Sequence, residues 1–66
     1  MVDAIGESAG KVWRYLAAQG PRSVSQIQRG TGLSQSLTYF ALGWLAREGK
    51  IRSKQEGRAL LVSIQG

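Results

Sequence analysis

The short segment Thr31-Gly32-Leu33-Ser34 constrains the fold of this chain more than any other part of its sequence. Gly32 tolerates a positive φ angle, Leu33 is suited to anchor a turn in an apolar core, and Ser34 is a favourable N-cap. Ile27 lies on the inward side of the segment before the turn, and an apolar-rich segment follows it. We therefore expect two helices, joined by a tight turn, near the middle of the 66 residues.

A longer helix is expected before this pair, over residues 3–19. Asp3 is a suitable N-cap, because its carboxylate accepts backbone N–H groups and complements the helix dipole. Gly20-Pro21 ends the helix, since glycine takes the left-handed conformation and proline cannot continue the hydrogen-bond ladder. One stripe of this helix is apolar and is expected to face the core: Ile5, Ala9, Val12, Leu16 and Ala17.

Two glycines, Gly6 and Gly10, lie inside that helix at a spacing of four residues. Each costs about 1 kcal/mol relative to alanine. On one helix face, they let another backbone come close. Two interpretations follow: tight packing within the chain, or a helix–helix contact in a dimer.

A short extended piece over residues 22–24 is expected next, followed by a helix that reaches about Gly30. Val24 and Ile27 are the apolar residues expected to pack inward from this region. Two pairs fit the capping-box pattern at the start of the helix, Ser23 with Gln26 and Ser25 with Gln28.

The rest of the chain predicts one more helix and a hairpin. The helix covers residues 35–48, and Gly49 ends it. Residues 51–55 and 59–64 alternate as two strands around a turn at 56–58. An isolated hairpin is marginal in water, so we expect it to pack on the helices, with residues 22–24 as a third strand at its edge.

Helix, short strand, helix, tight turn, helix and hairpin is the element order of a winged helix-turn-helix, an α+β fold. It has three helices, a C-terminal β-hairpin called the wing, and a short extra strand. No linker or repeat interrupts the pattern. We expect residues 1–66 to form a single domain of this kind.

Particular strings support this fold through resemblance. The strings at residues 23–27, 31–36 and 45–51 resemble winged helix-turn-helix regulators of the MarR-like and ArsR-like type. Residues 5–7, 9–13, Tyr39 and 41–48, the last reading Ala-Leu-Gly-Trp-Leu-Ala-Arg-Glu, resemble a small prokaryotic family of winged helix-turn-helix domains of unknown function. This resemblance spans nearly the whole chain, and it implies the fold and a homodimer but no established activity.

The composition argues against catalysis. The chain has no cysteine and no histidine, and its four acidic residues are scattered, so no metal site, disulfide or acid–base constellation is evident. We expect no enzyme activity, no cofactor and no small-molecule substrate. No signal peptide or membrane span is evident either, so we expect a cytoplasmic protein with no membrane partner.

The net charge of +5 favours a polyanion, and double-stranded DNA is the expected partner. In winged helices the third helix lies in the major groove. Its core side is expected to carry Thr38, Ala41, Leu42 and Leu45, and its solvent side Ser36, Tyr39, Phe40, Gly43 and Arg47. The residues able to read DNA are then Gln35, Ser36 and Tyr39.

Limited sequence specificity is expected, because no arginine or asparagine occupies the first two turns of that helix. The hairpin adds cations with two alternative roles. They could contact phosphates from the wing, or they could discourage strand-to-strand aggregation at an edge. These residues are Lys50, Arg52, Lys54 and Arg58.

The third helix also has an apolar arc of about 200°, wider than the ~100° stripe that one core needs. Phe40 falls near the centre of its outward face. Leu37 and Trp44 lie on one flank, where they either pack under the first helix or the wing, or meet an outside partner. The candidate protein-interface residues are Gly6, Gly10, Phe40 and Trp44.

Two functions therefore compete. The leading hypothesis is a DNA-binding domain in a transcription-regulator-like role, acting as a dimer with limited sequence specificity. It depends on the fold and on the positive charge. The alternative is a protein–protein interaction or dimerisation module that uses the winged helix fold without binding DNA, and it depends on the exposed aromatic residues.

Overall fold

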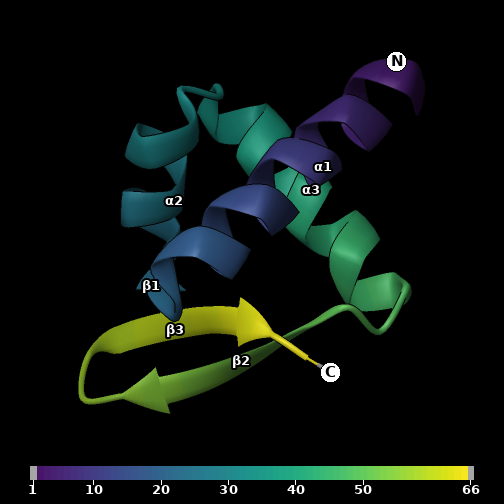
Figure 1. The fold of residues 1–66 in the computed structure, drawn as a ribbon. Helices are drawn as coiled ribbons and strands as arrows, with labels where there is room; N and C mark the ends of the chain where they lie inside the picture. The colour runs from purple at the N-terminus through teal and green to yellow at the C-terminus, as the bar shows by residue number, and fades with distance from the viewer. Residues whose placement is uncertain (1, 66) are drawn as a thin grey trace.

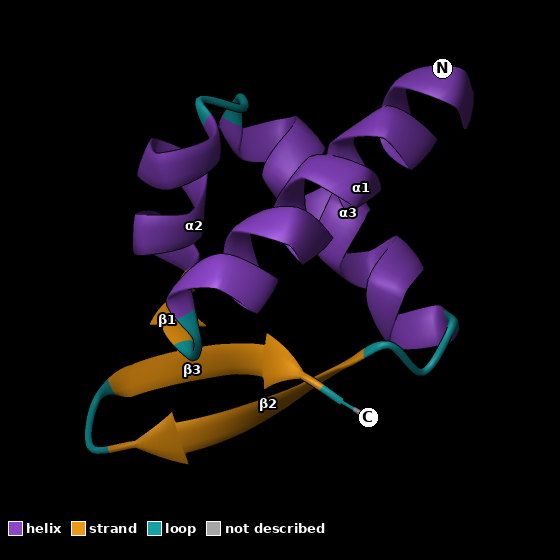
Figure 2. Ribbon diagram, in the orientation of Figure 1, coloured by secondary structure: helices purple, strands orange, loops and turns teal. Residues whose placement is uncertain are grey.

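A computed structural model describes residues 2–65, which form three helices and a three-stranded antiparallel sheet (Figures 1 and 2). This order confirms the expected α+β winged helix-turn-helix fold. The elements are α1 (Val2–Gln19), β1 (Arg22–Ser23), α2 (Val24–Thr31), α3 (Gln35–Arg47), β2 (Ile51–Glu56) and β3 (Ala59–Ile64).

The turn between α2 and α3 forms as its residues predict. Gly32 has a φ of 74°, caps α2, and donates its N–H to the carbonyl of Gln28 at 3.0 Å. Ser34 caps α3 by accepting the N–H of Leu37 on its hydroxyl at 3.2 Å. Leu33 is half-buried rather than buried, and it packs against the core from its edge.

Of the two predicted capping boxes, the one between Ser23 and Gln26 forms at the start of α2. The N–H of Gln26 donates to the Ser23 hydroxyl at 3.3 Å, and the Gln26 side chain accepts the N–H of Ser23 at 2.9 Å. Ser25 is exposed inside the helix. Ser23 is both the last residue of β1 and the N-cap of α2. Val24 is therefore helical, whereas the sequence predicted an extended conformation for it.

Several expected details of α1 are wrong. The helix begins at Val2, so Asp3 lies in the first turn and is not the N-cap, although its charge still complements the helix dipole. Ala17 is exposed, because the stripe that faces the core is centred on Val12 and Leu16 and the next residue turns about 100° away. Ile5 is half-buried.

Smaller shifts occur toward the C-terminus. Helix α3 ends at Arg47 with Glu48 as its cap, and Gly49 follows at a φ of 70°. Strand β2 runs one residue further than expected, through Glu56.

The sheet has the order β1-β3-β2, with β3 at its centre. Strand β1 pairs with β3 through Arg22 opposite Val62, so the expected third strand forms at the edge of the hairpin. Strand β2 pairs with the other edge of β3, from Ile51 opposite Ile64 to Glu56 opposite Ala59. The sheet closes one end of the helical layer (Figure 2).

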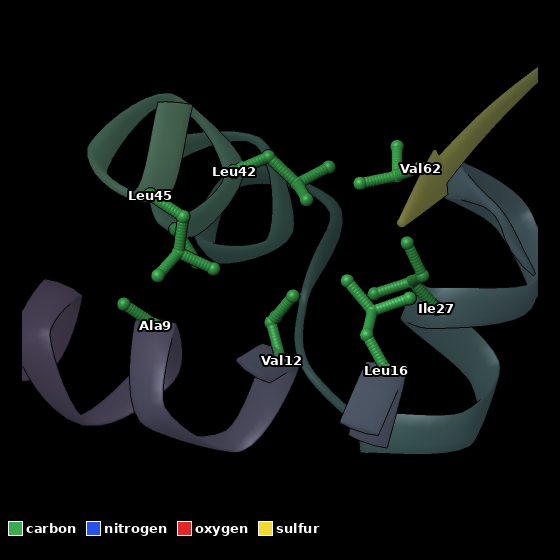
Figure 3. Close-up of a cluster of buried hydrophobic side chains, with 8 residues drawn as sticks. Ala9, Val12, Leu16, Ile27, Leu42, Leu45 and Val62 are labelled. Carbon is green, nitrogen blue, oxygen red and sulfur yellow. The ribbon is translucent and has the colours of Figure 1, made fainter. Parts of the chain in front are cut away.

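The core lies where the three helices meet β3. Figure 3 shows Leu45 above Ala9, Val12 below Leu42, and Val62 close to Leu42 and Ile27. The α3 residues expected to face inward are all buried. The buried apolar residues are Ala9, Val12, Leu16, Ile27, Ala41, Leu42, Leu45 and Val62.

A close contact joins α1 to α2 at the edge of this core. The half-buried ring of Tyr15 lies against the backbone of Gly30. A Cβ atom on Gly30 would lie 2.8 Å from the Tyr15 hydroxyl and closer still to two ring carbons. Glycine is therefore required at position 30 for the two helices to meet in this way.

Candidate nucleic-acid interface

The outward face of α3 is uncovered along its length. Ser36, Gly43 and Arg47 are exposed, and Tyr39 and Phe40 expose 56% and 52% of their surface. The sequence therefore placed the two sides of this helix correctly. The inward side packs on α1 (Figure 3), so the outward face points away from α1.

The three residues expected to read DNA lie together at the start of this face. Gln35 and Ser36 are the first two residues of α3, and Tyr39 follows one turn later. All three are exposed. Ser36, Tyr39 and Phe40 line a shallow hollow on the surface.

A cleft of about 340 Å³ separates α3 from the wing. Tyr39, Gly43 and Ala46 line it from α3, and Leu60 lines it from β3 with 44% of its surface exposed. A Cβ atom on Gly43 would meet no atom within 4 Å. The backbone of α3 is therefore open at Gly43 to anything that docks between the helix and the wing.

The wing cations are not one cluster. Arg52 pairs with Ser63 and Lys54 with Leu61, so both cations project from the face of the sheet opposite the buried Val62. They line a hollow there together with Glu56. Arg58 lies in the turn at the tip of the hairpin.

Lys50 lies at the opposite end of the hairpin, in the loop before β2. Six strand residues separate it from the tip, which is about 20 Å at the usual rise per residue. Its N–H donates to the Leu45 carbonyl at 2.9 Å, and its own carbonyl accepts the N–H of Gln65 at 2.9 Å. This end of the hairpin borders a different surface.

That surface is a groove of about 600 Å³ between α1, α3 and the end of β3, here called the α1–α3 groove. It brings together three of the four expected interface residues, Gly6, Gly10 and Trp44. Phe40 does not line it, because this residue lies on the outward face one turn earlier. The groove is lined by Gly6, Ala9, Gly10, Trp13, Arg14, Trp44, Leu45, Lys50 and Gln65.

Two tryptophans line the groove, Trp44, which was expected at an interface, and Trp13, which was not. Trp13 and Trp44 each expose 40% of their surface, so Trp44 is not packed away under α1 or the wing. Leu37 lies two turns earlier on the same flank of α3 and is half-buried. Helical spacing from Gly6 and Gly10 places Trp13 on the same face of α1, and this signal was sufficient to find it.

The space beside the two groove glycines is largely empty of other atoms of the described residues. A Cβ atom on Gly6 would meet nothing within 4 Å, and one on Gly10 would meet only the Arg14 guanidinium Nη1 at 3.4 Å. Tight packing inside the chain is therefore not the reason for these glycines. Space for an outside partner remains.

Within residues 2–65, no group of three or more acidic residues is placed to hold a metal ion. Nor is any helix in this part of the chain long and apolar enough to span a membrane.

Comparison with known proteins gives a consistent result. A family model described as a winged helix-turn-helix domain (DUF2582) matches residues 1–64. The uncharacterized protein MJ1608 from Methanocaldococcus jannaschii is 36% identical over 64 residues, covering 92% of this chain and 90% of that protein.

Solved structures with the same fold include protein BT2368 from Bacteroides thetaiotaomicron, with a TM-score of 0.85 and 32% identity over 94% of this chain and 76% of that one. A structure of HOP2, described by its DNA recognition and protein interaction domains, has a TM-score of 0.72 and 32% identity, covering 88% of this chain and 98% of that one.

The third structure is Mb0332 from Mycobacterium bovis. It is described as a homodimeric winged helix-turn-helix DNA-binding domain of a possible ArsR-family transcriptional regulator. It has a TM-score of 0.75 and 27% identity, covering 98% of this chain and 64% of that one.

Proposed function

Because this chain belongs to the family of winged helix-turn-helix domains (DUF2582), we propose that it binds double-stranded DNA in a transcription-regulator-like role with limited sequence specificity. One observation carries the proposal. The outward face of α3 begins with exposed polar residues and lies uncovered beside the wing, which carries exposed cations on the far face of its sheet and at its tip. A helix that reads a major groove needs such an open polar face.

The charge and the relatives support the same function. The chain carries nine basic and four acidic residues, a net charge of +5, which favours a polyanion. The HOP2 structure is described as concerning DNA recognition and protein interaction domains, and Mb0332 is described as a DNA-binding domain. The fold itself does not specify a ligand, so the support for DNA binding comes mainly from the exposed residues of this chain.

In the proposed complex, α3 enters the major groove by its first two turns. Gln35 is suited to an adenine edge, Ser36 to a base or a phosphate, and the Tyr39 hydroxyl to a phosphate. Phe40 lies beside them and is suited to an apolar contact with a thymine methyl group. Since no arginine or asparagine stands in these turns, discrimination between sequences is weak.

The wing adds contacts that do not depend on sequence. Arg58 at the tip of the hairpin and Arg52 and Lys54 on its outer face are exposed, and each can neutralise a phosphate. Lys50 lies at the far end of the hairpin and is expected to contribute less. The protein acts without catalysis or a cofactor, and we place it in the cytoplasm as a DNA-bound factor.

A fluorescence-anisotropy titration of a labelled duplex, repeated at several salt concentrations, tests this function. Log affinity is expected to fall linearly with log salt concentration. Lys54→Ala or Arg58→Ala is expected to reduce that slope by about 1 for each lost phosphate contact.

Lys11→Ala is the matched control, since Lys11 is exposed on α1, away from the outward face of α3. It removes the same charge and is expected to leave the slope nearly unchanged. Absence of binding at low salt, or an equal effect of all three variants, would contradict the proposed interface.

The second candidate function is protein–protein association, and the α1–α3 groove favours it. Two half-exposed tryptophans around an open groove are typical of an interaction site. A homodimer agrees with both candidates, because Mb0332 is described as homodimeric and DNA-binding. Binding of another protein without any DNA affinity would favour this second function.

A further inference from the structure

Helix α1 differs in charge from the rest of the molecule. It carries Asp3 and Glu7 in its first half and Lys11 and Arg14 in its second half, so its formal charge is zero. The remaining residues hold seven of the nine basic and two of the four acidic side chains, which leaves +5. Two copies of this chain therefore repel each other at most orientations, but not through α1.

The charge order along α1 is also complementary to itself. When two such helices lie antiparallel, the acidic half of each faces the basic half of the other. Antiparallel packing also sets the two helix dipoles in a favourable orientation. A parallel arrangement would place like charges together. The helix is therefore suited to pair with an antiparallel copy of itself.

The α1–α3 groove lies along the same side of α1. Helical spacing places Gly6, Gly10 and Trp13 on one face, with Asp3 and Arg14 at its border. The Arg14 guanidinium lies over Gly10, at the position where a Cβ atom would be 3.4 Å from it. A cation is thus held at the edge of the groove, within reach of a partner's carboxylate.

We propose that the groove is occupied by a second copy of this chain, with the two α1 helices packed antiparallel around a two-fold axis near residues 8 and 9. This axis brings Asp3 opposite the partner's Arg14, and the symmetric pair forms on the other side. Gly6 and Gly10 let the two backbones approach closely. Trp13 and Trp44 cover the contact from either side.

This inference deepens the dimer that accompanies the proposed function. The outward face of α3 points away from α1, so pairing through α1 leaves the DNA-reading faces of both copies free. The first turns of α1 extend past the other helices, so this part of α1 is not covered by them (Figure 1).

The size of the contact sets the expected affinity. A helix of 18 residues is about 27 Å long. One such helix with two flanking tryptophans covers less surface than the ~600 Å² per partner at the low end of stable interfaces. A weak dimer, with a dissociation constant of about 10 to 100 µM, is therefore expected.

Sedimentation equilibrium of the whole chain without DNA, from about 1 µM to about 1 mM, measures this association. Gly6→Gln is expected to weaken it about tenfold or more, because the new side chain fills the space that the partner needs. Within one copy the same change meets only open space and replaces a poor helix former, so the thermal midpoint should not fall.

Ala4→Gln is the matched control. Ala4 is exposed on α1 and lies about 200° around the helix from Gly6. It receives the same side chain and is expected to change the dissociation constant by no more than about twofold.

A charge exchange tests the antiparallel order. Arg14→Asp alone, and Asp3→Arg alone, place like charges opposite each other and are expected to weaken the dimer several-fold. The double variant restores two opposite-charge pairs in each dimer, so dimerisation should return to within about threefold of the original. Circular dichroism shows whether each variant retains its helices.

Three outcomes overturn the proposal: a monomer at the highest concentration, a dimer that tolerates Gly6→Gln, or a double variant no better than the singles. None of these bears on DNA binding, which is measured separately with Gly6→Gln and a short duplex. If that monomeric variant still binds with an unchanged salt slope, DNA binding stands independently of the dimer. If it fails to bind DNA while the original chain dimerises without DNA, the proposed dimer stands and DNA binding depends on it.

Discussion

Because Tyr15 packs against Gly30, adding a single methyl group at position 30 is expected to destabilise the fold. In Gly30→Ala, the added Cβ atom would lie 2.8 Å from the Tyr15 hydroxyl and nearer to the ring. Spacing below 3.0 Å is not tolerated by real Cβ atoms, so the ring or α2 must move. The ring is half-buried against the core, and its displacement also loosens the packing of α1 on α2.

The expected cost follows from two opposing terms. Overpacking of this kind costs about 1 to 3 kcal/mol. Alanine recovers up to about 1 kcal/mol of helix propensity relative to glycine. With the full recovery, the free energy of unfolding should therefore fall by up to about 2 kcal/mol, which lowers the thermal midpoint of a chain this size by up to roughly 15 °C.

Urea denaturation followed by circular dichroism measures this change, with Gly43→Ala as the matched control. A Cβ atom on Gly43 meets nothing within 4 Å, so the same substitution should raise the free energy of unfolding by up to about 1 kcal/mol. In a Tyr15→Ala background, Gly30→Ala should lose its penalty, because the clashing ring is gone. If Gly30→Ala is as stabilising as Gly43→Ala in the original chain, the reasoning from the ring contact is refuted.

The remaining predictions concern one cap and two exposed positions. Ser23→Ala should cost about 1 kcal/mol of stability by removing the cap of α2, whereas Ser25→Ala should be nearly neutral in the same denaturation assay, since Ser25 is exposed inside the helix. Gly43→Ala should weaken DNA binding measured by anisotropy while raising the thermal midpoint, if the duplex approaches the open backbone of α3; equal affinity would place the duplex elsewhere. Phe40→Ala should change stability by less than about 0.5 kcal/mol, because half of its surface is exposed, and it should weaken DNA binding; unchanged affinity would remove Phe40 from the interface.

Local signals account for most of the fold that the sequence predicted. Gly32 and Ser34 mark the turn because their roles depend on backbone geometry within a few residues. The two sides of α3 follow from helical periodicity, which is also local. Strand β1 was expected as a third strand at the edge of the hairpin, but its register with β3 was not, because the paired residues are about 40 positions apart.

The site was predicted less completely, because surfaces combine distant elements. Trp13 and Lys50 join Trp44 in one groove only after α1, α3 and the hairpin have packed together. Lys50 and Arg58 had both been assigned to the wing, but strand β2 lies between them and places them at opposite ends of the hairpin. The contact of Tyr15 with Gly30 left no signal in either segment by itself.

The central position of β3 has a consequence for the order of assembly. Strand β3 is the last of the described elements along the chain, yet both other strands pair with it and neither pairs with the other. Its Val62 also completes the core beside Leu42 and Ile27 (Figure 3). During synthesis from the ribosome, the helices can therefore form early, but they have no sheet to close their apolar end until residues 59–64 have emerged. A nascent chain that stops before Ala59 would be helical, but its apolar core residues would stay exposed and would favour aggregation. Addition of the six-residue strand β3 closes the domain in one cooperative step.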